Sequence, residues 1–187
     1  MKLKNNYIVI RHGQAVSNQN QTLSSWPEKF KNHLTKKGIK EIRRIIPKLK
    51  KERIDLIFTS DLLRTKQTAQ MLAKKLKLKV NFDKRLREVN VGIFNGELVK
   101  QWNIFFANNL EKFIKKSPQG ENRREIKKRI IDFIEDIDEK YSNKNILIIG
   151  HGDPLRILQG SVKGLSEKEM SKQWKKFKIN TGQYRKL

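Results

Sequence analysis

Short apolar runs alternate with longer amphipathic stretches along this chain. The apolar runs are YIVI (7–10), DLIFTS (55–60), KVNF (79–82) and NILIIG (145–150). Short runs rich in β-branched residues are typical of strands, and the unbroken run YIVI predicts a strand that is buried on both faces. KVNF is the weakest of these signals, and the C-terminal KINTGQYRKL is a candidate for a further edge strand.

The amphipathic stretches between these runs predict helices. LTKKGIKEIRRIIPKLK (34–50) offers Thr35 as its N-cap, and Pro47 near its end predicts a kink or a break. SDLLRTKQTAQMLAKKL (60–76) offers Ser60 or Asp61 as its cap. The apolar face of this second helix would consist of Leu62, Ala69, Leu72, Ala73 and Leu76.

A third amphipathic stretch, ENRREIKKRIIDFIEDIDEKY (121–141), also has an apolar stripe, whereas its acidic run EDIDE (135–139) predicts a solvated face. The stripe consists of Ile126, Ile130, Phe133, Ile134, Ile137 and Tyr141. Strands that alternate with helices are typical of βαβ units. The sequence therefore predicts an α/β fold with a largely parallel sheet.

Two segments break this alternation. Residues 15–33 are polar and irregular, and residues 86–120 hold a glycine-punctuated loop followed by the helix-like stretch QWNIFFANNLEKFIKK. Loops of such length often cover a functional site. We expect one domain over residues 1–187, with residues 86–120 inserted as a cap or lid.

Composition narrows the classes of function. The chain has 187 residues, no cysteine and a formal net charge of +24. Without cysteine there is no disulfide and no thiolate chemistry. The apolar run near the N-terminus is too short for a signal peptide or a membrane span, so we expect a cytoplasmic protein without a membrane partner. Its oligomeric state, monomer or homodimer, is open at this stage.

The positive charge raises nucleic acid as a partner. The lysines, however, are spread along the whole chain and often occupy the polar positions of helical patterns. Neither an aromatic-rich RNA-binding signature nor a zinc-finger spacing occurs. A lysine-rich solvated surface is the better interpretation, and a nucleic-acid partner is the lesser expectation.

Residues able to do chemistry follow the predicted strands and one turn. They are Arg11-His12-Gly13 after the first strand, Arg64 after DLIFTS, Glu88 after the turn at Phe82, and His151-Gly152-Asp153 after NILIIG. In open α/β sheets, ligands bind outside the carboxyl ends of the strands. We therefore expect two arginines, two histidines and a carboxylate to converge at one edge.

This set suits a phosphoryl group. Arginine matches phosphate oxygens with two donors, a neutral imidazole can attack phosphorus, and a carboxylic acid such as Glu88 can protonate the leaving alkoxide. Gly13 and Gly152 would let the backbone approach the anion. A metallohydrolase that uses His12, His151, Glu88 and Asp153 as ligands is the rival hypothesis. Two arginines beside the histidines would repel a divalent cation, and no HExxH spacing occurs.

The ordered motifs RHGQAVSN, LTKKG, SDLLRTKQTA, LREVNVGIFNG, PQGEN and IIGHGD resemble the histidine phosphatase superfamily, also called phosphoglycerate-mutase-like. The resemblance implies a three-layer α/β/α fold with a mostly parallel central sheet, and a phosphohistidine intermediate formed without a metal or other cofactor. It implies these site residues: His12 as nucleophile, Glu88 as proton donor, and Arg11, Arg64, His151 and Asn18 around the phosphate.

The chain departs from the family pattern at three places. Gln14 stands where glutamate is common, QNQTLSSWPEKFKNH replaces the usual glycine-containing substrate loop, and Asn122 stands where serine usually continues the PxGE motif. The central pocket residues are all present. The departures therefore concern substrate recognition.

The resemblance leaves a phosphatase and a cofactor-dependent phosphoglycerate mutase as alternatives, with a nucleic-acid-binding or non-catalytic member of the same fold as a second alternative. Only Val89 to Ser117 separates Glu88 from Pro118, and no extended tail follows NTGQYRKL, whereas such mutases have a longer insertion and a tail. We therefore expect a phosphoric monoester hydrolase, of the histidine acid phosphatase type, acting on a small phosphorylated metabolite. Lys36 or Lys100 would help to capture it.

Overall fold

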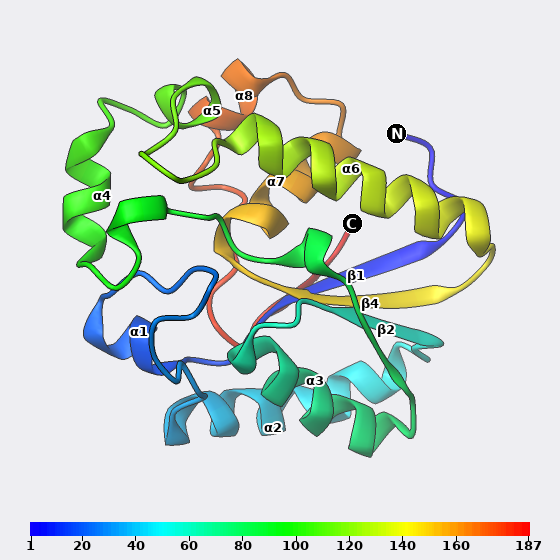
Figure 1. Ribbon diagram of the computed structural model, residues 1–187. Helices are drawn as coiled ribbons and strands as arrows, with labels where there is room; N and C mark the ends of the chain where they lie inside the picture. The colour runs from blue at the N-terminus through cyan, green and yellow to red at the C-terminus, as the bar shows by residue number, and fades with distance from the viewer.

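The computed structural model describes residues 1–187 and has a five-stranded sheet between two layers of helices (Figure 1). The strands are β1 (Asn6–Arg11), β2 (Leu56–Thr59), β3 (Val80–Phe82), β4 (Asn145–Gly150) and β5 (Tyr184–Lys186). Their order is β3-β2-β4-β1-β5, and only β5 runs antiparallel to its neighbour. The predicted three-layer α/β/α fold is confirmed, including the KVNF strand and the C-terminal edge strand.

Four long helices form the outer layers. Helices α2 (Lys36–Lys51) and α3 (Leu63–Leu76) cover one face of the sheet, and α6 (Arg123–Lys140) and α7 (Gly152–Val162) cover the other (Figure 1). The remaining helices are the short α1 (Val16–Asn20), α4 (Val99–Phe105), α5 (Glu111–Ile114) and α8 (Glu167–Lys172), with 3-10 turns at Lys84–Leu86 and Gly92–Phe94. None of the helices combines the length and apolar character that a bilayer crossing requires.

The central strands are buried on both faces, which explains their continuous apolar runs. In β1, Tyr7 and Val9 pack into the larger core on the α6 side, while Ile8 and Ile10 pack into the smaller core on the α2 side. Strand β4 divides its side chains in the same way. Because successive side chains of a strand point to opposite faces, each of these strands contributes to both cores.

The helix ends confirm one predicted cap and correct two other expectations. Thr35 caps α2, because its Oγ1 accepts a hydrogen bond from the Gly38 N–H at 3.1 Å. The predicted break at Pro47 is wrong: α2 continues to Lys51, and both Pro47 and the residue one turn earlier face solvent, where water can satisfy the freed carbonyl. Ser60 and Asp61 do not cap α3, whose N-cap is Leu62.

Helix α6 explains one departure from the family pattern. Asn122 is its N-cap and forms a capping box with Glu125, so asparagine here takes the role that serine can take elsewhere. The predicted apolar stripe is buried, with Tyr141 partly so. The expectation of a solvated acidic run is wrong for Asp138, which is buried and accepts hydrogen bonds from the backbone of Lys4 and the side chains of Asn5 and Tyr7.

Residues 86–120, called here the cap segment, hold two short helices, α4 and α5, in place of the single helix-like stretch of the sequence. The loop of residues 21–27 runs beside the cap segment and is joined to it by several hydrogen bonds. These are Leu23 N to Glu97 O at 2.7 Å, Val99 N to Gln21 O at 2.9 Å, Ser25 N to Asn95 Oδ1 at 3.0 Å and Trp26 Nε1 to Glu88 O at 3.0 Å.

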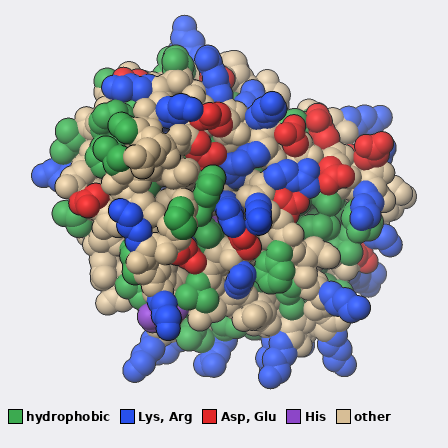
Figure 2. Space-filling view, in the orientation of Figure 1, with side chains coloured by type: hydrophobic (Ala, Val, Ile, Leu, Met, Phe, Trp, Pro, Cys, Tyr) green, Lys and Arg blue, Asp and Glu red, His purple; other side chains and the backbone are tan.

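The positive charge is spread over the surface. Figure 2 shows lysine and arginine side chains around the whole visible face, with acidic side chains between some of them. This distribution is the one expected for a lysine-rich solvated surface, and the visible face shows no single basic stripe of the kind that would follow a nucleic-acid backbone.

Two glycines allow the loop after β1 to pack on the first turn of α2. A Cβ added to Gly13 would lie 2.6 Å from the carbonyl oxygen of Gly38, and one added to Gly38 would lie 2.1 Å from that of Gln14. The expectation that Gly13 lets the backbone approach an anion stays a prediction, because these contacts do not test it. Its missing side chain serves the packing of α2 against the loop that carries His12.

We expect Gly38→Ala to destabilise the protein. Alanine improves helix propensity by about 1 kcal/mol, but the overlap with the Gln14 backbone forces a shift of the kind that costs about 1–3 kcal/mol. Urea unfolding of this variant should show a lower free energy of unfolding than the wild type. Lys40→Ala, on an exposed position of the same helix, is the matched control. A Gly38→Ala protein as stable as the wild type would contradict the proposed contact.

Candidate active site

The pairing of β1 with β4 brings the two buried histidines together. Arg11 lies opposite Gly150 in the parallel register, so the next residues of both strands, His12 and His151, meet at the carboxyl edge of the sheet. Their ring centroids are 5.2 Å apart in a T-shaped arrangement. The convergence predicted from the sequence is present.

The His12 ring is held in one tautomer. Nδ1 lies 2.8 Å from the carbonyl oxygen of Gly13, and since a carbonyl only accepts, Nδ1 carries the proton and Nε2 keeps its lone pair. Nε2 in turn accepts a hydrogen bond from Arg64 Nε at 3.3 Å. Burial, reinforced by Arg64 and Arg11, holds the pKa of His12 well below its ordinary value. A neutral imidazole with an unprotonated nitrogen can act as a nucleophile.

His151 is fully buried beside it and has one free nitrogen. Its Nε2 lies 2.9 Å from the hydroxyl of Ser60, and its Nδ1 has no hydrogen-bond partner. Burial lowers the pKa of His151 well below its ordinary value, and the charge of Arg64 adds to the effect. Ser60, considered from the sequence only as a helix cap, therefore positions the second histidine.

The two arginines approach from different elements. Arg64 lies on the first turn of α3, is 2% exposed, and donates from Nη2 to the carbonyl oxygen of Ser24 at 3.0 Å and from Nη1 to Glu28 Oε1 at 3.2 Å. Burial lowers the pKa of Arg64 to about 10, although Glu88 and Glu28 oppose this. Arg11 ends β1, and its Nε is buried without a partner.

Sequence reasoning missed Ser24 and Glu28, which hold Arg64 in place. Both belong to the irregular 15–33 segment, where no periodic pattern indicates which polar residues point inward. Their proximity to Arg64 depends on how this loop folds back over α3, which the local sequence does not encode.

Glu88 faces the arginines from the cap segment and meets the first turn of α7. Its Oε2 accepts the Gly152 N–H at 3.0 Å, and its Oε1 accepts the Val89 N–H at 3.0 Å. Burial and the nearby Asp153 raise the pKa of Glu88, against the charge of Arg64. A Cβ on Gly152 would lie 3.6 Å from Glu88 Oε2, an ordinary contact distance, so the expected approach of this backbone to an anion stays a prediction.

The polar residues of the first loop complete the arrangement. Asn18 lines the site and accepts the Ala15 N–H through Oδ1 at 2.9 Å. Gln14, where the family commonly has glutamate, accepts the Thr35 hydroxyl through Oε1 at 2.8 Å. Gln14 therefore anchors α2 to the loop.

These residues surround a cavity of about 380 Å³, called here the catalytic cavity. Arg11, His12, Asn18, Arg64 and Glu88 line it, together with aromatic and cationic side chains: Trp102 and Lys112 of the cap segment, Arg123 of α6, Arg156 of α7, and Trp174. Sequence reasoning missed Lys112, Arg123, Arg156 and Trp174. A lysine between aromatic residues of an irregular segment, such as Lys112, gives no periodic signal of burial.

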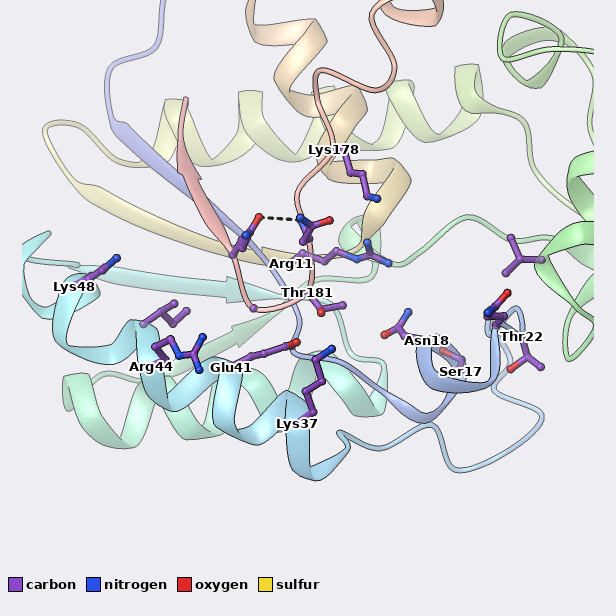
Figure 3. A pocket seen from close by; sticks show the side chains of 16 residues that line it. Arg11, Ser17, Asn18, Thr22, Lys37, Glu41, Arg44, Lys48, Lys178 and Thr181 are labelled. Carbon is purple, nitrogen blue, oxygen red and sulfur yellow. Dashed lines mark hydrogen bonds between the residues drawn. The ribbon is translucent and has the colours of Figure 1, made fainter.

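A wider groove of about 760 Å³, called here the outer groove, adjoins the catalytic cavity (Figure 3). Arg11 reaches into this groove (Figure 3). The lower side of the groove is lined by Lys37, Glu41 and Arg44 of α2, and its other side by Lys178 of the C-terminal segment (Figure 3). Lys36 and Lys100 line neither space, so the expectation that they capture substrate is wrong. Lys37 lies on the face of α2 that lines the groove, whereas Lys36 lies outside it.

The rival metal hypothesis finds no ligand set. No three His, Asp or Glu side chains gather in a cluster that could hold a metal ion. His12 Nε2 faces the Arg64 guanidinium, and Asp153 is paired with Arg123 at 3.0 Å. Arginine side chains therefore lie beside His12 and Asp153, where a metal ion would have to bind.

A neutral histidine between arginines, at the carboxyl edge of a mostly parallel sheet, is an arrangement chemically suited to a phosphoryl group. The chain belongs to the histidine phosphatase superfamily (branch 1), whose family model matches residues 7–185. The resemblance drawn from the sequence motifs is confirmed.

Known proteins similar to this chain include both phosphatases and mutases. A probable phosphoglycerate mutase from Yersinia enterocolitica is 29% identical over 164 residues, which cover 84% of this chain and 74% of that protein. Phosphoserine phosphatase 1 from Hydrogenobacter thermophilus is 23% identical over 172 residues, 89% of this chain and 79% of that protein. The mycobacterial glucosyl-3-phosphoglycerate phosphatase structure superposes with a TM-score of 0.83 at 19% identity, covering 97% of this chain and 88% of the other.

The tautomer and charge of His12 and His151 can be observed directly. Since burial and the neighbouring arginines lower the pKa of both rings, we expect both to stay neutral in the folded protein when the pH is lowered below ~6.5, the ordinary value for histidine. The unfolded chain binds those protons, so stability should fall as the pH drops through this range. Nitrogen NMR of the imidazoles tests this, with exposed His33 as internal reference. A protonated His12 in the folded protein near neutral pH would exclude the assigned tautomer.

Proposed function

We propose that the protein is a metal-independent phosphomonoesterase that acts on a small phosphorylated metabolite through a phosphohistidine formed on His12. The observation that carries the proposal is the state of His12: a buried, neutral imidazole whose Nε2 lone pair faces a buried arginine at 3.3 Å. This supports attack on an electrophile that is anionic, because only an anion profits from the arginines around it. A cavity of about 380 Å³ suits a small ligand.

In the first step, Nε2 of His12 attacks phosphorus and the bond from phosphorus to the ester oxygen breaks. Arg11 and Arg64 neutralise the equatorial oxygens, so no cation is required to balance them. Glu88, whose pKa is raised by burial, gives its proton to the leaving oxygen. Hydrogen bonds from the N–H groups of Gly152 and Val89 hold its carboxyl group in place.

In the second step, water attacks phosphorus of the phosphohistidine and gives a proton to the Glu88 carboxylate. The bond from phosphorus to Nε2 breaks, inorganic phosphate leaves, and both residues return to their starting states. The Ser60 hydroxyl accepts the Leu62 N–H at 3.3 Å and can donate to His151 Nε2. That donation leaves the proton of His151 on its unpartnered Nδ1, which supports a role as donor to a phosphate oxygen. Asn18 supplies a further amide from the same side.

Hydrolysis is favoured over mutase chemistry by access for water. A mutase must exclude water while the phosphate waits on histidine. Here the catalytic cavity adjoins the outer groove of Figure 3, and the shared lining residues Arg11, Ser17, Asn18, Thr22 and Val99 support an approach for water from that side. We propose that the cap segment is an insertion in a single domain and that it covers only one side of the site.

Replacing the nucleophile tests the covalent step. We expect His12→Ala to reduce turnover by about three orders of magnitude or more, since a nucleophile acts as part of a unit, and to abolish phosphorylation of the protein. Mass spectrometry after a quench without acid should find phosphate on His12 of the wild type. His33→Ala, at an exposed histidine, is the matched control. Phosphate on Ser17 or Ser60, or an active His12→Ala variant, would refute the mechanism.

A panel of phosphometabolites, scored for free phosphate, tests hydrolysis against isomerisation. Sugar phosphates, nucleotides and α-ribazole phosphate belong in the panel, beside 3-phosphoglycerate with 2,3-bisphosphoglycerate. We expect phosphate release to exceed isomerisation and to be unchanged by a chelator, because the arginines already balance the charge. Faster isomerisation would assign a mutase, and activity lost in EDTA and restored by zinc or manganese would assign a metallohydrolase.

A further inference from the structure

We propose that the natural substrate carries a second anionic group besides the phosphate that is removed, and that Lys112 and Arg156 bind this group. The inference rests on the proposed phosphatase function and names the class of its substrate: a phosphomonoester that also has a carboxylate or a second phosphate. It comes from cations in the catalytic cavity that the phosphoryl mechanism does not use.

Three cations beyond the phosphate-binding arginines share the cavity with one further carboxylate. Lys112, Arg123 and Arg156 line it, and Asp153 faces them. Arg123 already has its partners: its Nε and Nη2 both lie 3.0 Å from Asp153 Oδ2, and its guanidinium lies 3.5 Å from the ring centre of Trp174. Asp153 therefore compensates Arg123, and the charges of Lys112 and Arg156 remain.

Arg156 has no hydrogen bond that satisfies its guanidinium. Its Nη1 is 3.8 Å from Asp153 Oδ1, which is too far for a hydrogen bond, and its Nε is buried without a partner. A buried donor left unpaired costs free energy, and a planar guanidinium is suited to a carboxylate or phosphate. An anion in the cavity would supply the missing acceptor.

Lys112 is a buried cation with a single acceptor. It is 7% exposed, its Nζ donates to Asn103 Oδ1 at 2.8 Å, and the same Nζ lies 4.1 Å from the ring centre of Trp102. Burial lowers its pKa to about 8, and Arg123 and Arg156 add to this effect while Asp153 opposes it. Taking an ammonium group out of water without a carboxylate beside it is unfavourable. An anion bound beside the ammonium group would offset this desolvation cost.

The outer groove is the other place where a second anion can bind. Its Lys37, Arg44 and Lys48 are exposed, so water and salt screen them. Lys112 is buried and the Arg156 side chain is only 17% exposed, so an anion beside them is screened less and gains a larger interaction. The experiment below separates the two locations.

Matched substrate pairs test the proposal. One pair is 3-phosphoglycerate and glycerol 1-phosphate, which differ by a carboxylate; the other is glucose 1,6-bisphosphate and glucose 6-phosphate, which differ by a phosphate. In the wild type, we expect kcat/KM for the member of a pair that carries the second anionic group to exceed that of the member without it by about ten- to a hundredfold, the worth of a charged hydrogen bond.

The variants Lys112→Gln and Arg156→Gln should each bring this ratio close to one. Lys100→Gln, at an exposed lysine of α4 outside both cavities, should leave the ratio unchanged. Lys112→Arg should keep the preference. Since kcat/KM reports groups of the free enzyme, the wild-type preference should also decline as the pH rises through about 8, where Lys112 loses its charge. Lys112→Arg should remove that decline.

The possible failures are distinguishable. A wild type that hydrolyses p-nitrophenyl phosphate but shows no preference in either pair overturns the second-anion site and leaves the phosphatase intact. A preference that survives in Lys112→Gln and Arg156→Gln, but is lost in a Lys37→Gln/Arg44→Gln variant, places the anion in the outer groove and overturns the assignment. Hydrolysis of none of the phosphomonoesters, p-nitrophenyl phosphate included, overturns the proposed function and the inference with it.

Discussion

The parallel pairing of β1 with β4 is the contact on which both the core and the site depend. The register that sets Ile8 beside Leu147 and Ile10 beside Ile149 buries these side chains under α2 and α3. The same register sets Arg11 beside Gly150 and so brings His12 next to His151. A slip of one residue would turn every side chain to the opposite face. The burial of the apolar side chains therefore holds the two imidazoles in place.

Much of this arrangement could be predicted from the sequence because it depends on local patterns. The strands YIVI and NILIIG have unbroken apolar runs, and the residues after them come together by a general rule of parallel sheets. Thr35 could be predicted as a cap because its hydroxyl satisfies a donor three residues away. The ordered motifs around His12, Arg64 and His151 are also local patterns of the sequence, and they were sufficient to identify the family.

The rest depends on contacts between distant segments. Glu28 and Ser24 reach Arg64 only through the course of an irregular loop. Asp138 is buried because the N-terminal residues cross the end of α6, which no helical periodicity reveals. Lys112 was expected on the surface as a lysine, yet aromatic rings cover its stem and charge. The net charge of the chain was similarly uninformative, since the cations that matter to the site are the few that are buried.

The hydrogen bonds between the 21–27 loop and the cap segment bear on how the protein moves. Backbone bonds at Leu23 and Val99 and the Trp26 bond to the Glu88 carbonyl join the loop to the segment that carries Glu88, the proposed proton donor. Loop and cap therefore form one cooperative unit, and opening it requires several bonds to break together. Amide hydrogen exchange in the two segments would then rise and fall in step. Because Trp26 is bonded to the Glu88 carbonyl, opening this unit would also displace Glu88.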